Sequence, residues 1–272
     1  HPDGSVVTCD LLCDGTHFSL SNDSPHRIGR KALAVNLSDL AAMAAEPVAA
    51  FLAVALPRAH TDIAEPLLEG MLPLAEQFQV AIAGGDTNVW DGPLVVSITL
   101  IGRCPHKPLL RSGAQPGDQL LVTGTFGGSR LGKQFEFTPR VYEAMQLQRE
   151  QPLHAGIDCS DGLSLDASRL AEESGCGVAI DLAAVPVSEA AREMGSQDAT
   201  LSALQRALGD GEDFELLLAV PPERAASLLA TQPLAVPLTR IGTFTERAGL
   251  WQEAEKWIPL SATGYEHGSD HE

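Results

Sequence analysis

Aspartate residues that follow apolar strands are the side chains of this sequence best suited to chemistry. In the stretch Gly156–Leu163 a buried strand is expected to break into a helix, with Asp158 and Asp161 at the turn between them. Ser160 is a candidate N-cap residue, and Gly162 lets the backbone bend. Two carboxylates about 4 Å apart repel by roughly 4 kcal/mol at an effective dielectric constant of about 20, so a cation between them would stabilise the turn. The alternative is a capped turn that binds nothing.

A similar arrangement recurs twice in the first half of the chain. Asp10 follows the expected strand Ser5–Cys9, and Asp86 follows the expected strand Gln79–Ala83 in a turn that contains glycine. Asp39 lies within a mostly apolar stretch of helical periodicity, where a carboxylate must reach either solvent or a cation. Mg²⁺ prefers oxygen ligands and commonly binds phosphate oxygens as well. The sequence therefore predicts a site where Mg²⁺ ions bridge carboxylates and a polyphosphate.

The sequence disfavours two other kinds of site. Gly127–Gln134 has the spacing of a P-loop, but Gln134 replaces the Ser or Thr that would bind Mg²⁺. The following residues, Phe135–Pro139, are a poor start for the helix that such a loop requires. A Ser-His-Asp hydrolase is weaker still, because the chain has no Gly-x-Ser-x-Gly motif. By its position alone, His17 is more simply explained as a structural histidine.

The composition limits the class of protein. The chain has 272 residues, of which 44% are hydrophobic, enough for two domains with cores of their own. Its formal net charge of −18 argues against nucleic acid or an anionic membrane as a partner. Five cysteines without a Cys-x-x-Cys pair favour reduced thiols in a cytoplasmic protein. The longest uncharged apolar run, Val48–Leu56, is too short to cross a bilayer.

Periodicity and turn signals predict an α+β protein of two domains. The turn-rich stretch Arg111–Asp118 reads as a connector, and we place the boundary near residue 108, which gives domains 1–108 and 109–272. A tail is expected from Tyr265 onward. The expected strands are 5–9, 48–56, 79–83, 94–101, 119–123, 177–182, 214–220, 238–244 and 250–257. The expected helices are 26–45, 61–78, 140–150, 163–173, 188–194, 200–208 and 222–230.

Five motifs, in the same order and over nearly the whole chain, resemble those of the thiamine-monophosphate kinase family. They are Lys31–Met43, Gly84–Thr87, Arg111–Ala114, Ile157–Leu163 and Gly211–Leu216. The resemblance implies the two-domain fold shared with aminoimidazole ribonucleotide synthetase, with mixed sheets flanked by helices. The N-terminal domain would bind ATP and Mg²⁺ and form a homodimer, and the C-terminal domain would complete the active-site cleft. The implied reaction is ATP-dependent phosphorylation of thiamine monophosphate to thiamine diphosphate.

The same resemblance implies roles for individual residues. The Mg²⁺ ligands would be Thr8, Asp10, Asp39, Asp86, Asp158 and Asp161. Contacts with ATP would come from Gly85, Asp86, Arg111 and Ser160, with Asp161 and Arg111 acting in catalysis. His17 and Glu212 would bind the thiamine phosphate, which gives His17 a function that its position alone does not suggest. Transfer would be direct and in line between two phosphates, without a covalent enzyme intermediate.

The sequence also departs from the family pattern. The family's Gly-Asp-Asp metal motif, which precedes the strand that ends at Asp10, is not among these residues, so we expect one metal ligand to be absent from them. An aromatic residue often found two positions before the C-terminal Gly-Tyr pair is replaced by Ala262. Two alternatives therefore stay open: another ATP-dependent synthetase of the same superfamily, and a protein that binds nucleotide or thiamine phosphate without catalysis.

Overall fold

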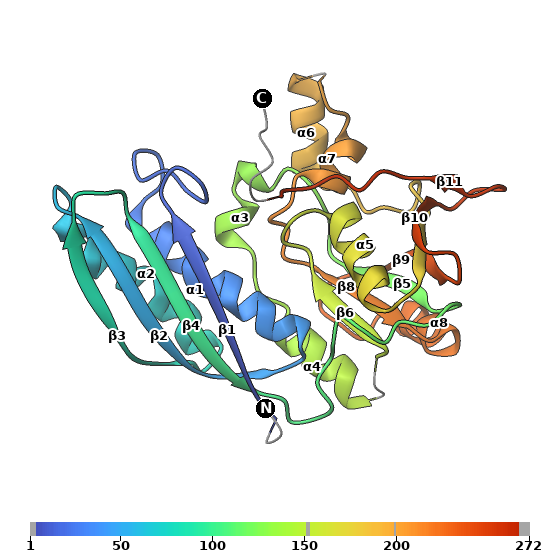
Figure 1. The fold of residues 1–272 in the computed structure, drawn as a ribbon, viewed down its shortest axis with the longest axis horizontal. Coiled ribbons are helices and arrows are strands. Elements are labelled where there is room, and N and C mark those ends of the chain that lie inside the picture. The colour runs from blue at the N-terminus through green and yellow to red at the C-terminus, as the bar shows by residue number, and fades with distance from the viewer. Residues whose placement is uncertain (1–3, 151–152, 199, 267–272) are drawn as a thin grey trace. The chain divides into compact units, whose positions relative to one another are not determined.

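The computed structural model of the chain describes residues 4–150, 153–198 and 200–266. It consists of two compact units, which are described separately. The first unit comprises His1–Pro108 and Phe135–Met145, and the second comprises Leu109–Gln134 and Gln146–Glu272. Each unit holds one mixed β-sheet with helices packed on it, so the predicted α+β fold class is confirmed (Figure 1).

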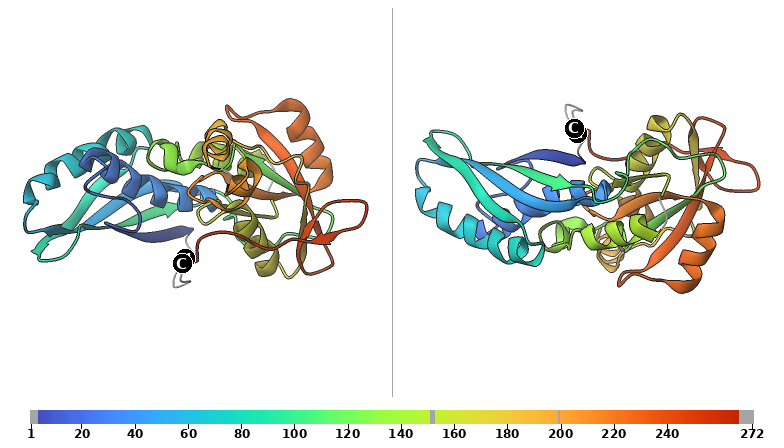
Figure 2. Two further views of the ribbon diagram at one scale, coloured as in Figure 1. Left: turned by 90° about the horizontal axis from the view of Figure 1, so that it is seen from above. Right: turned by 90° about the horizontal axis from the view of Figure 1, so that it is seen from below.

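The first unit is built on a four-stranded sheet in the order β1-β4-β2-β3. Its strands are β1 (Ser5–Cys13), β2 (Glu46–Pro57), β3 (Ala81–Trp90) and β4 (Val95–Arg103). The pairs β1–β4 and β2–β4 are antiparallel, and β2–β3 is parallel. The helices α1 (Pro25–Ala42) and α2 (Ala64–Gln77) cover one face of this sheet, with the short 3₁₀ helix η1 (Thr61–Ile63) before α2 (Figure 2).

Local sequence explains how α1 and α2 form and pair. The Ser24 side chain caps α1 by accepting a hydrogen bond from the Arg27 N–H. The two helices approach closely at glycines: a Cβ on Gly29 would lie 1.9 Å from the Leu67 carbonyl oxygen, and one on Gly70 would lie 2.0 Å from the His26 carbonyl oxygen. Only glycine leaves room for this contact.

Aromatic and arginine side chains hold Phe135–Met145 against the rest of the first unit. Arg30 of α1 donates hydrogen bonds to the carbonyl oxygens of Phe135 and Phe137, the latter at 2.7 Å. The ring of Tyr142 stacks on that of Phe78, with 5.2 Å between the centroids. These contacts explain why a segment that is flanked in the sequence by residues of the second unit belongs to the first unit.

Two strands of the first unit are longer than the sequence suggests. β1 continues through Asp10 to Cys13, paired with β4 along its whole length, so Asp10 lies inside a strand and not after one. β3 includes Gly84–Thr87, which we expected to form a turn. A Cβ on Gly85 would lie 1.8 Å from the carbonyl oxygen of Leu52 on the neighbouring strand β2. Gly85 therefore allows β3 to approach β2 closely, although in the sequence it resembles a turn residue.

The second unit contains a seven-stranded sheet in the order β11-β10-β7-β9-β5-β8-β6. Its strands are β5 (Gln119–Thr123), β6 (Ala155–Asp158), β7 (Gly177–Ile180), β8 (Leu216–Val220), β9 (Leu238–Thr245), β10 (Gly249–Gln252) and β11 (Ile258–Pro259). The remaining helices of the chain are η2 (Ser129–Leu131), α3 (Lys133–Glu136), α4 (Val141–Glu150), α5 (Leu163–Glu173), α6 (Glu189–Gln197), α7 (Ala203–Gly209) and α8 (Pro222–Thr231). Every residue of β6, β7 and β8 is buried, which explains their continuous apolar sequences.

Helix α5 has the bounds that its apolar periodicity predicts, Leu163–Glu173, and it packs against β6, β7 and β10. It therefore begins directly after the turn that follows β6, where Asp158 and Asp161 lie. In the part of the chain that the structure describes, no helix has the length and apolar character needed to cross a membrane.

Candidate functional site

Residues Asp158–Gly162, which we call the central turn, connect β6 to α5. Asp158 ends β6 and is 3% exposed. The segment before β8 is hydrogen-bonded to this turn: the Glu212 N–H donates to the Ser160 carbonyl oxygen at 2.7 Å, and the Phe214 N–H donates to the Cys159 carbonyl oxygen at 2.8 Å. Two of the predicted motifs, about 50 residues apart in the sequence, are thus joined in one place.

The central turn is capped by a residue other than the one predicted. We expected Ser160 to cap α5, but the N-cap position is Gly162, which has no side-chain oxygen. Instead, Oδ2 of Asp166 accepts hydrogen bonds from the N–H groups of Asp161, at 2.9 Å, and Gly162, at 3.2 Å. The Ser160 prediction was wrong because the helix begins two residues later, and a carboxylate from its first turn reaches back.

Arg169 neutralises the acidic side chains at the start of α5. Its guanidinium pairs with the Asp161 carboxylate and lies 2.9 Å from Oδ1 of Asp166. Burial raises the pKa of Asp166 to about 6, and the neighbouring N–H groups and Arg169 act against that rise. The sequence carries a signal for this arrangement, because Asp166 and Arg169 stand three residues apart on one helix.

A second group of predicted ligands lies in the first unit. Thr8 and Asp10 are two residues apart on β1, so both lie on the face of the strand that packs against α1. The Thr8 hydroxyl donates a hydrogen bond to Asp39 of α1. Burial, followed by the negative charge of Asp39, raises the pKa of Asp10 to about 7. The Oδ2 atom of Asp10 is buried and has no hydrogen-bond partner.

These three side chains suit a hard divalent cation. Two carboxylates and a hydroxyl offer oxygen ligands only, and a cation would supply the partner that Asp10 Oδ2 lacks. No group of three or more His, Cys, Asp or Glu side chains with metal-binding geometry occurs among the described residues. Mg²⁺ is usually held by one or two carboxylates together with waters and substrate phosphates, which fits the carboxylates of Asp10 and Asp39.

Asp86 is not brought to the same place within the first unit. Across the sheet, Asp10 lies opposite Ile98, Ile98 opposite Leu52, and Leu52 opposite Gly85. Three strand spacings of about 4.8 Å put Asp86 roughly 14 Å from Asp10. Within one chain, these two carboxylates therefore do not share an ion.

His17 is held in the loop that follows β1. The Cys13 N–H donates to its Nδ1 atom at 3.1 Å, and Nζ of the buried Lys31 donates to its carbonyl oxygen at 2.7 Å. An Nδ1 atom that accepts a hydrogen bond places the proton of the neutral ring on Nε2. His17 is thus oriented as a hydrogen-bond donor through Nε2.

Arg111 lies at the opposite end of α5 from Asp161. Its carbonyl oxygen accepts a hydrogen bond from the hydroxyl of Ser174, the residue that follows α5, at 3.2 Å. A helix of this length spans about 16 Å. The second unit therefore brings together Asp158, Ser160, Asp161 and Glu212, and it leaves Arg111 apart from them.

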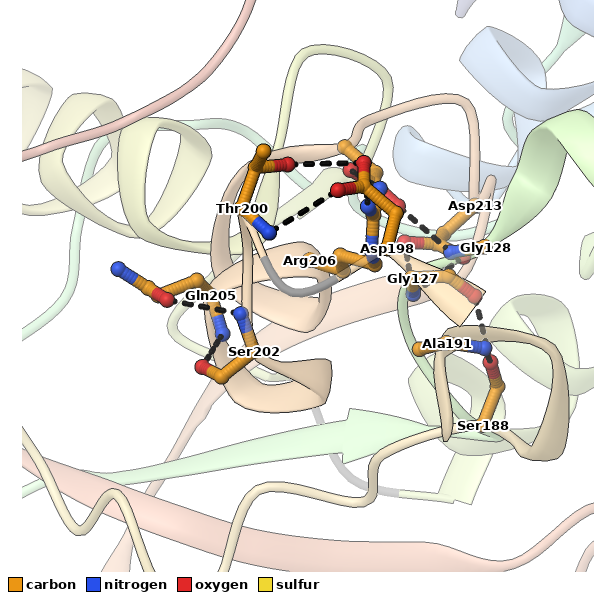
Figure 3. Close-up of polar contacts among 11 residues, drawn as sticks. Gly127, Gly128, Ser188, Ala191, Asp198, Thr200, Ser202, Gln205, Arg206 and Asp213 are labelled. Atoms are coloured by element: carbon orange, nitrogen blue, oxygen red, sulfur yellow. Dashed lines mark hydrogen bonds and ion pairs between the residues drawn. The ribbon is translucent and has the colours of Figure 1, made fainter. Parts of the chain in front are cut away.

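The glycine-rich loop, Gly124–Ser129, presents its N–H groups to carboxylates of the chain itself. The Gly127 N–H donates to Oδ1 and Oδ2 of Asp213, at 3.0 and 2.9 Å (Figure 3). The Gly128 N–H donates to Asp210 at 2.8 Å. Lys133, the counterpart of a P-loop lysine, forms ion pairs with Glu215 and Asp213. Since α3 has only four residues, the structure agrees with the prediction that this stretch is no P-loop.

The C-terminal segment adds a residue that the sequence did not single out. The Tyr265 N–H donates to the Asp161 carbonyl oxygen at 2.9 Å, and its side chain is 40% exposed. The hydroxyl of Ser164 in α5 holds the preceding Thr263 through its N–H, at 2.9 Å. Tyr265, where we expected a tail to begin, is thus fixed beside the central turn, while residues 267–272 lie outside the described part.

Comparison with known proteins identifies the family. The chain matches two domain families, AIR synthase related protein, N-terminal domain, over residues 2–104, and the corresponding C-terminal domain over residues 115–250. A thiamine-monophosphate kinase of Rhodopirellula baltica is 43% identical over 266 residues, which cover 97% of this chain and 83% of the relative. The thiamine-monophosphate kinase of Escherichia coli K12 is 34% identical, over 96% of this chain and 86% of the relative.

Solved structures agree. The crystal structure of thiamine-monophosphate kinase from Stenotrophomonas maltophilia K279a aligns with a TM-score of 0.80 at 36% identity, covering 90% of this chain and 84% of that one. AaThiL complexed with AMPPCP and TMP aligns with a TM-score of 0.85 at 26% identity, covering 97% and 87%. E. coli HypE, a hydrogenase maturation protein, shares the fold at 22% identity, with a TM-score of 0.76 over 96% of this chain and 87% of that one. The predicted resemblance is confirmed, and the chain belongs to the thiamine-monophosphate kinase family, with the two-domain AIR synthase-related fold.

Proposed function

We propose that this protein transfers the γ-phosphoryl group of ATP to the phosphate of thiamine monophosphate, which gives thiamine diphosphate and ADP. The observation that carries the proposal is the pairing of Glu212 with the central turn, in a chain 43% identical over 97% of its length to a thiamine-monophosphate kinase. A relative of the same fold, AaThiL, has been solved with AMPPCP and TMP bound.

The metal ligands in this proposal form two groups. Thr8, Asp10 and Asp39 would hold Mg²⁺ in the first unit, Asp158 and Asp161 would hold it in the second, and Asp86 would bind it from β3. Bound Mg²⁺ would neutralise phosphate charge and align the reacting groups. Before a cation binds, Arg169 holds the Asp161 carboxylate. The chain needs no nucleophilic side chain, because one phosphate attacks the other directly and catalysis consists of positioning and charge neutralisation.

Nucleotide and thiamine phosphate are assigned to different residues. Gly85, Asp86, Arg111 and Ser160 would contact ATP, and Arg111 would neutralise charge during transfer.

Thiamine monophosphate carries a phosphate, a cationic thiazolium ring and an aromatic pyrimidine, and each suits a different side chain. The Nε2 proton of His17 suits a phosphate oxygen, and the Glu212 carboxylate suits the cationic ring. Tyr265 is 40% exposed and its backbone N–H is bonded to the Asp161 carbonyl oxygen, so its ring would stack on the aromatic pyrimidine. This ring would replace the aromatic residue that is absent at Ala262.

An apolar sheet face supports the proposed homodimer. The face of the four-stranded sheet opposite α1 and α2 exposes Val7 (54%), Leu11 (55%), Val48 (46%) and Phe51 (41%). A row of exposed large apolar side chains of this kind marks an association surface.

The cytoplasm is the proposed location. All five cysteines are free thiols, which is typical of a reducing compartment. The net charge of −18 is consistent with the absence of nucleic acid or an anionic membrane among its partners.

Product analysis tests the proposed function. The purified protein is incubated with ATP, Mg²⁺ and thiamine monophosphate, and in parallel with substrates of the aminoimidazole pathway. We expect ADP and thiamine diphosphate in the first mixture only. Turnover confined to the second would overturn the assignment in favour of another synthetase of the superfamily. Calorimetric binding of thiamine monophosphate without turnover would instead indicate a binding protein that does not catalyse.

A further inference from the structure

The chain around Asp213 has an uncommon backbone conformation. Asp213 is 1% exposed and lies between Glu212 and Phe214, whose φ angles are 53° and 51°. Residues other than glycine seldom adopt these left-handed angles, because the Cβ atom crowds the backbone. Two such residues on either side of one buried carboxylate require that the surroundings hold the segment in place.

The Asp213 carboxylate is what anchors this segment to the glycine-rich loop. Both of its oxygens accept the Gly127 N–H, at 3.0 and 2.9 Å (Figure 3). Its Oδ1 atom also lies 3.5 Å from Nζ of Lys133. Lys133 also lies 3.2 Å from Oε1 of Glu215, so one partly buried cation pairs with two buried carboxylates. Hydrogen bonds to a charged acceptor are stronger than those to a neutral one, and burial increases their strength.

The other end of this contact is itself fixed. Gly127 has a φ of 85°, and a Cβ there would lie 2.6 Å from the Ala207 backbone nitrogen, so α7 and the loop are in close contact. The Gly127 carbonyl oxygen accepts a hydrogen bond from the Ser188 hydroxyl at 2.5 Å. The N–H group that Asp213 binds is therefore a rigid point of attachment.

The residues on both sides of Asp213 hold the central turn. The Glu212 N–H donates to the Ser160 carbonyl oxygen, and the Phe214 N–H donates to the Cys159 carbonyl oxygen. Their left-handed conformations aim these N–H groups at the turn. A change in the position of Asp213 would therefore move the Glu212 side chain and the metal-binding turn together.

We propose that Asp213 is a positioning residue, which anchors Glu212 and Phe214 to the glycine-rich loop and so sets the central turn and the Glu212 carboxylate at the spacing that the substrate requires. This inference rests on the proposed function, which places thiamine monophosphate on Glu212 and Mg²⁺ on Asp158 and Asp161. Lys133 acts through Asp213 as its counter-ion.

Asp210 provides a matched control. Its carboxylate accepts the next N–H of the same loop, that of Gly128, at 2.8 Å. Its own N–H donates to the Arg206 carbonyl oxygen and so ends α7, and does not bind the central turn. The substitutions D213N and D210N each remove one negative charge from a carboxylate that accepts an N–H of the glycine-rich loop, and only Asp213 lies between two residues that bind the central turn.

The test compares D213N and D210N with the wild-type protein in two measurements. The dissociation constant for thiamine monophosphate is measured by calorimetry without ATP, and the Mg²⁺ concentration for half-maximal turnover is measured separately. We expect D213N to raise both by about tenfold or more, the size of effect typical of groups that orient a ligand-binding residue. D210N should leave both within about twofold of the wild type. Equal values in the two variants would overturn the inference.

If circular dichroism shows that D213N does not fold, D213E takes its place. This variant keeps the charge and the ion pair but moves the carboxylate by one methylene. Weaker binding than in D210N is then expected, and unchanged binding refutes the positioning role. Failure of the wild-type protein to bind thiamine monophosphate would instead refute the proposed function on which the inference rests.

Discussion

The substitution Asp161→Asn tests whether Asp161 is a metal ligand or only a structural residue of the central turn. The backbone contacts of Asp161 survive the change, because its N–H still reaches Asp166 and its carbonyl oxygen still accepts the Tyr265 N–H. The side chain loses its ion pair with Arg169, in which the two partners are 30% and 36% exposed. A pair this exposed contributes about 0.2–1 kcal/mol. Arg169 also keeps its contact with Asp166 at 2.9 Å.

The expected loss of stability without ligand is therefore less than about 1 kcal/mol. For a protein of this size that corresponds to a fall in Tm of at most about 2–4 °C. The behaviour with ligand should differ much more. At a concentration one hundred times its dissociation constant, a ligand adds about 2.7 kcal/mol to the stability of the native state, or about 5–10 °C in Tm. An amide oxygen binds Mg²⁺ far less well than a carboxylate, so the variant should gain less than a third of this shift.

Thermal melts with and without Mg²⁺ and AMPPCP, run beside the kinase assay, measure both effects. The control is D91N, which removes one charge from the exposed pair of Asp91 with Arg58, at 2.7 Å. We expect D91N to keep the ligand-induced shift and normal turnover, and D161N to lose both. If D161N still turned over within about threefold of the wild type and kept its full shift, Asp161 would not be a metal ligand.

Three further predictions concern association, packing and pH. Leu11→Glu, on the exposed sheet face, should convert a dimer to a monomer in size-exclusion chromatography with light scattering, and an unchanged dimer would rule out this face. Gly85→Ala should destabilise the fold by about 2–3 kcal/mol in urea unfolding, because the new Cβ would lie 1.8 Å from a carbonyl oxygen. In the control Gly117→Ala the new Cβ meets nothing within 4 Å, so this change should cost only about 1 kcal/mol for its left-handed φ. Equal losses in the two variants would contradict this reasoning. Burial raises the folded-state pKa of Asp213 from 3.8 to about 6, and Lys133 acts against this rise. The contribution of Asp213 to stability is therefore present below about pH 4 and is lost as the pH rises through about 6. The stability of the wild type relative to D213N should fall between about pH 4.5 and 7 in urea unfolding, and a constant difference would contradict this reasoning.

Local sequence signals were sufficient to predict the secondary structure around the part of the site that lies in the second unit. The apolar periodicity of Leu163–Glu173 predicts α5 with its observed bounds, and the apolar run before Asp158 predicts a strand that ends there. Both depend on residues within one or two turns of the chain. The meeting of Glu212 with the central turn depends on the pairing of β6 with β8, and here only the family motifs indicated the contact.

Signals that depend on distant partners were misread. β1 continues through Asp10 because β4 offers it a partner as far as Cys13, and nothing in the local sequence shows where that partner ends. Gly85 resembled a turn residue, although its role is to let β3 approach β2.

The two groups of carboxylates are stabilised differently before a cation binds, so repulsion between carboxylates favours a bound cation more strongly in one group than in the other. Repulsion between Asp158 and Asp161 suggested a cation at the central turn, but Arg169 already pairs with Asp161, so Mg²⁺ must displace an existing partner there. In the first unit, Oδ2 of Asp10 is buried without a hydrogen-bond partner, and the charge of Asp39 contributes to the raised pKa of Asp10. A bound cation would supply that missing partner, so the environment of Asp10 favours cation binding.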